Sequence, residues 1–135
     1  MKVILTSFRE SPRWNHPKYS IARWNPHDYK WMFRLDWLAP IDEKGTMRHL
    51  SPNEFRDRYN KLLESKAIRL NQFLDNLLAV NMSEVVFCCW CYLQRQPQYD
   101  KLYCHRILIG FWLEKNRPNV KVVYSDGAQN PIWER

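Results

Sequence analysis

The chain has 135 residues, which is the size of one domain. Its composition, with 45% hydrophobic and 26% charged residues, is typical of a globular protein. With only three glycines it contains neither G-x-G-x-x-G nor G-x-x-x-x-G-K, which excludes the common glycine-rich phosphate loops. The net charge is +7, and the excess lies in two regions, with seven Lys or Arg against two acidic residues in 1–34 and six against two in 94–121. This distribution favours an anionic partner, and the alternative is a basic surface that only keeps the protein soluble.

The location of the protein is predicted from its termini and cysteines. Residues 1–7 form too short an apolar run for a signal peptide, and no longer run is apolar enough to span a membrane. Four cysteines, at positions 88, 89, 91 and 104, are then expected to act as thiols, ligands or core residues. We expect a cytoplasmic protein without membrane contact.

The first half of the chain begins with a β-branched run at 3–8 that predicts a strand. Residues 9–34, rich in Pro, Arg, His and Trp, predict a long ordered loop region with a short strand at 19–23. Ser51, Pro52 and Glu54 form a helix start, with an N-cap and a capping box. Apolar residues at helical spacing continue to about position 80, and a break near 65–66 would divide this stretch into two helices.

The second half contains the best candidate for a buried strand, at 84–91, which is apolar on both faces as a central parallel strand is. Alternation places Cys89 and Cys91 on the face of Phe87, and Cys88 and Trp90 on the other face. A polar loop at 92–102, a helix at 103–116 and a strand at 120–124 complete a βαβ unit. The predicted fold is a single α/β domain over 1–135: a small Rossmann-like parallel sheet with flanking helices and a long N-terminal loop region.

The predicted site lies where the strand around Cys89 and Cys91 ends, because parallel sheets bind ligands at the carboxyl ends of their strands. Cys104, His105 and Arg106 open the next helix at the same edge, where free N–H groups and the helix dipole favour an anion. The guanidinium of Arg106 matches phosphate or carboxylate.

These features predict a pocket for a small phosphorylated molecule, such as a nucleotide-like one, formed by Arg23, Arg106 and the amides at Cys104. Whether the chain is an enzyme stays open. If it is, Cys104 is the candidate nucleophile, with a pKa lowered by the helix N-terminus and by Arg106. His105 is the candidate to assist it, although adjacent helical side chains diverge by about 100°.

Simpler interpretations stand beside this one. Cys88 and Cys89 could be small buried hydrophobic residues, His105 a packing or capping residue, and Arg106 the partner of a structural carboxylate. No cofactor is expected. Zinc at Cys89, Cys91 and Cys104, with His105, is the alternative, but the Cys-x-Cys spacing is unusual for zinc.

The N-terminal region interleaves aromatic and basic side chains. They are Trp14, Trp24, Trp31, Phe33 and Trp37 with Arg13, Arg23, Lys30 and Arg34. This mixture suits a nucleic-acid-binding module over residues 9–37, in which rings stack on bases beside phosphate contacts. We favour large side chains that fill a loop-covered core, because no known nucleic-acid-binding motif accompanies them. A further alternative is a non-catalytic interaction or sequestering protein anchored by exposed tryptophans. The oligomeric state stays open.

Several short patterns follow one another in a fixed order along the chain. They are Thr6-Ser7-Phe8; residues 19–23 with Pro26; Leu38-Ala39-Pro40; Phe55 with Tyr59; residues 85–90; and Cys104-His105-Arg106. Over nearly its whole length the chain thus resembles domain-of-unknown-function family 488. The most specific element is a strand that ends in Cys and an aromatic residue, followed shortly by Cys-His-Arg.

The resemblance implies a compact α/β domain with a polar pocket at these motifs. Its pocket residues here would be Ser20, Arg23, Cys89, Cys104, His105 and Arg106, and we add Thr6, Ser7 and Cys91 as ligand-binding candidates. The family has no settled activity to carry over. It usually has an acidic residue directly after the Cys-aromatic pair, where this chain has Cys91, so a thiol-based or purely binding role gains weight.

Overall fold

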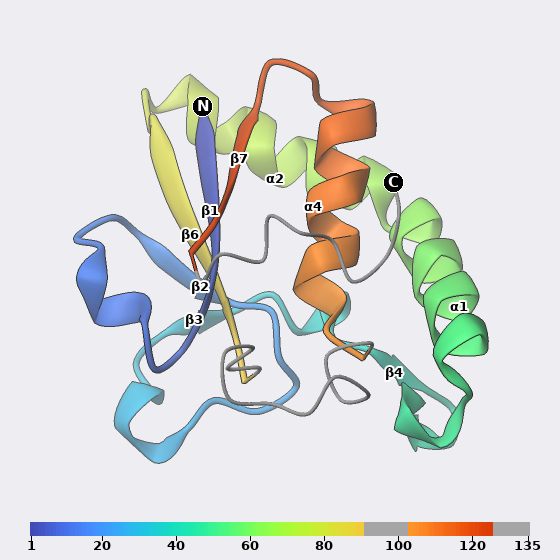
Figure 1. Cartoon of the computed structure of the whole chain (residues 1–135). Helices are drawn as coiled ribbons and strands as arrows, with labels where there is room; N and C mark the ends of the chain where they lie inside the picture. The colour runs from blue at the N-terminus through green and yellow to red at the C-terminus, as the bar shows by residue number, and fades with distance from the viewer. Residues whose placement is uncertain (91–102, 126–135) are drawn as a thin grey trace.

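A five-stranded sheet forms the centre of the protein (Figure 1). The computed structural model describes residues 1–90 and 103–125. The strands are parallel and ordered β3 (Phe33–Arg34), β2 (Lys18–Ser20), β6 (Glu84–Cys89), β1 (Lys2–Ser7) and β7 (Lys121–Tyr124). The small Rossmann-like α/β fold predicted from the sequence is confirmed. Predictions for residues 91–102 and 126–135, including most of the polar loop and the face of Cys91, lie outside the described residues.

Strand β6 is central because both of its faces are apolar. Its residues 85–89 are fully buried, and the strand pairs with β1 on one side and with β2 on the other. Phe87 and Cys89 face one hydrophobic cluster, whereas Cys88 faces a second cluster on the opposite side of the sheet. The predicted alternation of these three side chains is confirmed.

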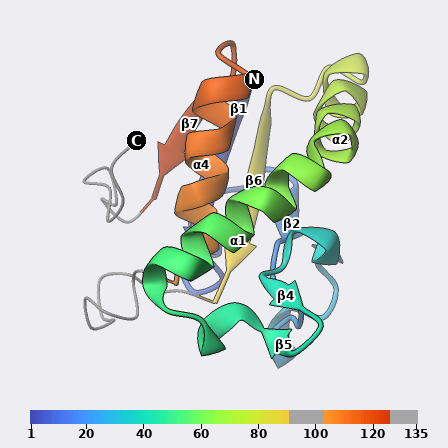
Figure 2. The same cartoon turned by 90° about the vertical axis from the view of Figure 1, so that its right-hand side faces the viewer.

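The helices α1 (Pro52–Ser65), α2 (Ala67–Ala79) and α4 (His105–Asn116) pack on one face of the sheet, as Figure 2 shows. Helix α1 begins where predicted, since the Ser51 hydroxyl accepts the Glu54 N–H at 3.3 Å. The break at Lys66 separates α1 from α2. Both helices turn their periodic apolar residues toward the sheet, which contributes most of their stability.

The opposite face is covered by the N-terminal loop region instead of helices. Phe8, Ala22 and Met32 from this region pack against Ile4 of β1 and Val86 of β6. Two short 3-10 helices, η1 (Ser11–Arg13) and η2 (His27–Tyr29), lie within the region. The Asn25 amide donates to the carbonyls of Tyr29 and Met32, and these bonds fix the end of the loop before β3.

A small hairpin that the sequence analysis did not predict lies near the carboxyl edge of the sheet (Figures 1 and 2). It consists of β4 (Ile41–Asp42) and β5 (Gly45–Thr46), between the 3-10 helices η3 (Asp36–Leu38) and η4 (Met47–His49). Gly45 has φ +104°, a value that side chains rarely tolerate. The Asp42 carboxylate accepts the Lys44 N–H and contacts His49 Nε2, each at 2.9 Å, which fixes the turn.

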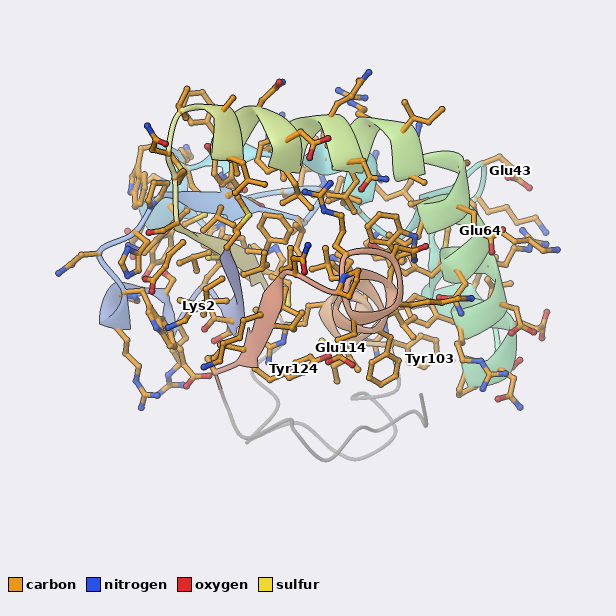
Figure 3. The ribbon with its side chains drawn as sticks, turned by 90° about the horizontal axis from the view of Figure 1, so that it is seen from above. Lys2, Glu43, Glu64, Tyr103, Glu114 and Tyr124 are labelled. Atoms are coloured by element: carbon orange, nitrogen blue, oxygen red, sulfur yellow. The ribbon has the colours of Figure 1, made fainter. Side chains whose placement is uncertain are left out.

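Helix α4 and β7 approach each other closely at Gly110. A Cβ atom there would lie 2.2 Å from the Tyr124 hydroxyl oxygen. The same hydroxyl donates to the Glu114 carboxylate at 3.2 Å, and Figure 3 shows the two side chains together on β7 and α4. Gly110 therefore allows the helix to sit directly on the last strand. In the described ranges, no helix combines the length and the apolar character needed to cross a bilayer.

Candidate functional site: a cavity at the carboxyl edge of the sheet

A cavity of about 270 Å³ opens just beyond the carboxyl ends of β2 and β6. Residues 22–24 follow β2, Trp90 follows β6, and residues 103 and 105 flank the start of α4. The hairpin segment 40–48 and Phe55 of α1 complete the wall. The cavity thus collects residues from five separate parts of the chain at one edge of the sheet.

The floor and the rim of the cavity differ in chemistry. The floor consists of buried, mainly apolar side chains: Ala22, Met47, Phe55, Tyr103 and His105. The rim consists of exposed side chains: Arg23, Trp24, Thr46, Arg48 and Trp90. An apolar floor favours a flat or apolar group, whereas cationic groups at the mouth favour a negative charge near solvent.

The rim at Trp24 is held by several contacts. The Trp24 ring is 62% exposed and lies beneath two guanidinium groups, at 5.3 Å for Arg23 and 5.8 Å for Arg34. Arg34 also donates to the Arg23 carbonyl at 2.8 Å, and the Trp90 indole N–H donates to the Trp24 carbonyl at 2.7 Å. These contacts reduce the conformational freedom that a ligand would otherwise have to remove.

Arg48 also lines the cavity, and its guanidinium lies 5.0 Å from the centre of the Tyr103 ring. Tyr103 is fixed by its hydroxyl, which donates to the Leu50 carbonyl at 2.6 Å. Arg23 and Arg48 both line the cavity and arise from segments 25 residues apart in the chain. Their convergence is a product of the fold.

His105 is a buried, neutral part of the floor. Its Nε2 lies 2.8 Å from the Ile21 carbonyl oxygen, and because a carbonyl only accepts, Nε2 carries the proton. Burial, opposed by Cys89 and the bond to Ile21, lowers the pKa of His105, so Nδ1 keeps a lone pair at neutral pH. The ring lies edge-on to Tyr59, with centroids 5.5 Å apart. The bond to Ile21 couples the start of α4 to the segment that carries Arg23 and Trp24.

The candidate nucleophile Cys104 is fully buried at the N-cap of α4, and it does not line the cavity in the part of the chain described. Cys89 is equally buried in the helix-covered core. On the other face, burial and the neighbouring Cys89 raise the pKa of the Cys88 thiol to about 12. Burial also raises the pKa of Tyr59, whose hydroxyl donates to the Leu38 carbonyl at 2.6 Å. This environment favours neutral side chains over reactive anions.

The predicted hydroxyl residues make structural hydrogen bonds. Ser7 Oγ accepts the Glu10 N–H and Ser20 Oγ accepts the Ala22 N–H, each at 3.2 Å directly after a strand. The Ser125 hydroxyl donates to Thr6 Oγ1 at 2.7 Å. All three predicted residues are buried, and their bonds shape the turns at this edge, including the turn that leads to Arg23.

Arg106 lies in the first turn of α4, and its side chain is the largest of those that are fully buried. Its positive charge acts inside the protein, where it disfavours protonation of His105 and favours the thiolate of Cys88. The two predicted arginines therefore differ: Arg23 is exposed and lines the cavity, whereas Arg106 is fully buried and is not one of the lining residues.

The zinc alternative has no assembled site among residues 1–90 and 103–125. Within these ranges, no three His, Cys, Asp or Glu side chains converge on a point where a metal ion could bind. Cys91, which the alternative also requires, lies outside them.

The sequence analysis predicts Arg23 and His105 as site residues but does not single out several other residues of the cavity, among them Arg48, Met47 and Tyr103. Arg48 follows a hairpin too short to produce a periodic pattern, so no local signal marks it. Tyr103 directly precedes the Cys-His-Arg motif, and its place beside that motif is the one feature of the sequence that could have predicted it as a site residue. The sequence analysis favours a core position for Trp24, and this prediction is wrong, because the side chain is largely exposed.

The chain matches no protein-family model, no curated protein and no solved structure in the comparisons. The resemblance to domain-of-unknown-function family 488 therefore stays a prediction, and a function is inferred from the fold and the cavity of this α/β protein.

Proposed function

We propose that the chain binds a small molecule that combines a flat ring with a negatively charged group, as a nucleoside monophosphate does. The observation that carries the proposal is the joint lining of one cavity by two exposed tryptophans and two arginines above an apolar floor. The ring would enter toward Phe55 and Tyr103, and the charged group would remain at Arg23 and Arg48. The proposed ligand is still the phosphorylated molecule that the sequence predicts. Its second arginine would be Arg48, which lines the cavity, instead of the buried Arg106.

The proposal requires no thiol chemistry. Neutral His105 offers Nδ1 as a hydrogen-bond acceptor, which suits recognition of an N–H group on a ligand. A reaction at Cys104 would require its buried side chain to become exposed first. A binding function follows from the arrangement of the described residues more directly than a catalytic one.

The proposal is tested by calorimetric titration with adenosine and uridine monophosphates at low salt. The matched nucleosides lack the charge and ribose 5-phosphate lacks the ring, so each should bind at least about tenfold more weakly, the equivalent of one lost charge-assisted bond or stacked ring. Arg23→Ala with Arg48→Ala should reduce affinity for the monophosphate by about 10–100-fold.

The matched control is Lys61→Ala with Lys115→Ala, which removes the same charge from exposed helix positions away from the cavity. It should leave the affinity nearly unchanged. Equal losses in both double variants, or no binding of any monophosphate by the wild-type protein, would contradict the proposal.

A further inference from the structure

Aromatic contacts continue beyond the mouth of the cavity. The Trp31 ring is 66% exposed, and its centroid lies 6.1 Å from that of Tyr29. Tyr29 lies 5.7 Å from Phe8, and Phe8 lies 5.6 Å from Trp90, which lines the cavity. A row of ring contacts thus connects the cavity to Trp31. Phe8 in this row is buried and Tyr29 is half-buried, so the rings open to a ligand are the exposed indoles at its two ends.

Basic side chains accompany this row. Residues 23–34 carry Arg23, Lys30 and Arg34 against the single carboxylate of Asp28, and all four side chains are exposed. Arg23 and Arg34 are already ordered over Trp24. Aromatic faces beside ordered cations are the surface that proteins present to single-stranded nucleic acid, because bases stack and phosphates pair.

The form of the cavity is compatible with an extended ligand. Its volume of about 270 Å³ lies near the lower end of the usual range for small-molecule pockets, roughly 300–1,000 Å³. It accommodates a ring and leaves the attached groups outside, directly on the rim that leads to the aromatic row. A free mononucleotide would use the cavity but would not reach Trp31.

We propose that the cavity takes one nucleotide of a single-stranded nucleic acid whose neighbouring nucleotides stack along residues 23–34 as far as Trp31. This inference rests on the proposed function, since it extends the ligand of the same cavity. Double-stranded nucleic acid fits less well, because its bases are already stacked on each other and cannot cover the exposed rings.

Fluorescence anisotropy with labelled oligonucleotides of about six residues, within the usual range of site sizes, tests the inference. Single-stranded DNA or RNA should bind at least about tenfold more tightly than the mononucleotide, and its affinity should fall steeply as salt rises. The same sequence as a duplex should bind more weakly. A poly-glutamate peptide that competes as well as the oligonucleotide would show attraction to charge alone and would overturn the inference.

Variants separate the two proposals. Trp31→Ala should reduce oligonucleotide affinity by about 5–150-fold, the range for one lost stacked base, and should leave mononucleotide affinity unchanged. Trp31→Phe, which keeps a stacking face, should restore most of the affinity. Ile68→Ala, at another exposed apolar position, is the control and should change neither.

Each outcome has a distinct meaning. If the mononucleotide binds but the oligonucleotide binds no more tightly, or if Trp31→Ala has no effect on it, the inference fails and the proposed function stands. If neither ligand binds, both fail. A third outcome is that oligonucleotide binding depends on Trp31, while Arg23→Ala with Arg48→Ala has no effect on mononucleotide binding. In that case the proposed binding in the cavity is wrong, and only the nucleic-acid surface at residues 23–34 is supported.

Discussion

The two edges of the sheet carry cavities of similar size and different chemistry. At the amino edge, a cavity of about 290 Å³ lies between Met1, Leu78 and residues 116–120. One guanidinium, that of Arg117, belongs to its lining, where it pairs with the Asp75 carboxylate at 2.9 Å and with Asn71 at 3.1 Å. At the carboxyl edge, two arginines and two exposed tryptophans meet at the mouth. Cavity volume alone therefore says little about binding, and the chemistry of the lining distinguishes the two edges.

The largest expected effect concerns the thiols behind the carboxyl-edge cavity. Because Cys88 and Cys104 are fully buried, alkylation of either in the native protein should be at least roughly 100-fold slower than in the unfolded chain, and should require local opening. Peptide mass analysis after timed labelling of a Cys91→Ser variant measures this, since position 91 lies outside the described residues. A Cys104 that reacts as fast as a free thiol near neutral pH would restore the nucleophile hypothesis.

The second effect concerns the close contact between helix α4 and strand β7 at Gly110. Gly110→Ala should destabilise the protein, because its Cβ overlaps Tyr124 at a cost of about 1–3 kcal/mol, more than the approximately 1 kcal/mol that alanine gains in a helix. Chemical denaturation measures the free energy of unfolding. In a Tyr124→Ala background the same substitution should become neutral or stabilising, and an equal loss in both backgrounds would contradict the contact.

The third effect is a pH dependence at the floor of the carboxyl-edge cavity. Burial lowers the folded-state pKa of His105, so the unfolded chain binds the proton more readily. Stability from this residue is therefore present above the unfolded value of about 6.5 and is lost as pH falls below it, by at most about 1.4 kcal/mol per pH unit.

A His105→Gln variant tests this dependence, because its amide can still donate to the Ile21 carbonyl but does not titrate. The difference in unfolding free energy between the wild-type protein and the variant should change between pH 7.5 and pH 5.5, with the wild type losing more. A difference that is independent of pH would mean that His105 is not held neutral.

The smallest effect is expected at the amino edge. Leu78→Asn changes a half-exposed side chain in the lining of that cavity, and it should alter stability by less than about 1 kcal/mol. Its affinity for a nucleoside monophosphate, measured by the same titration, should equal that of the wild-type protein. A loss comparable to that of the double arginine variant would remove the distinction between the two edges.

The sequence predicted the elements whose signals are local and periodic. The apolar run at 84–89, the cap at Ser51 and the helical spacing that follows it specified β6, α1 and α2. The sequence also predicts a possible break near residues 65–66, and the two helices separate at Lys66. The parallel sheet followed from the βαβ order, which the pairing of β1 with both β6 and β7 confirms.

The candidate site was less predictable because it depends on tertiary contacts. Arg48 follows the short hairpin of β4 and β5, and no periodic signal predicts either this turn or the joint lining of one cavity by Arg48 and Arg23. Arg106 belongs to a motif that favours anion binding, but the packing of α4 encloses its side chain. Trp24 is exposed beside two sets of tertiary hydrogen bonds, those of Asn25 and of Trp90, which the local sequence does not reveal.

The central claim is that a ring-bearing anion occupies the carboxyl-edge cavity, and a nuclear magnetic resonance titration with a nucleoside monophosphate tests it most directly. We expect the indole N–H signals of Trp24 and Trp90 and the ring signals of His105 to shift with one common affinity, while the signals of Leu78 and Val120 stay in place. Shifts confined to Leu78 and Val120, or no saturable shift at Trp24, Trp90 and His105, would contradict the account.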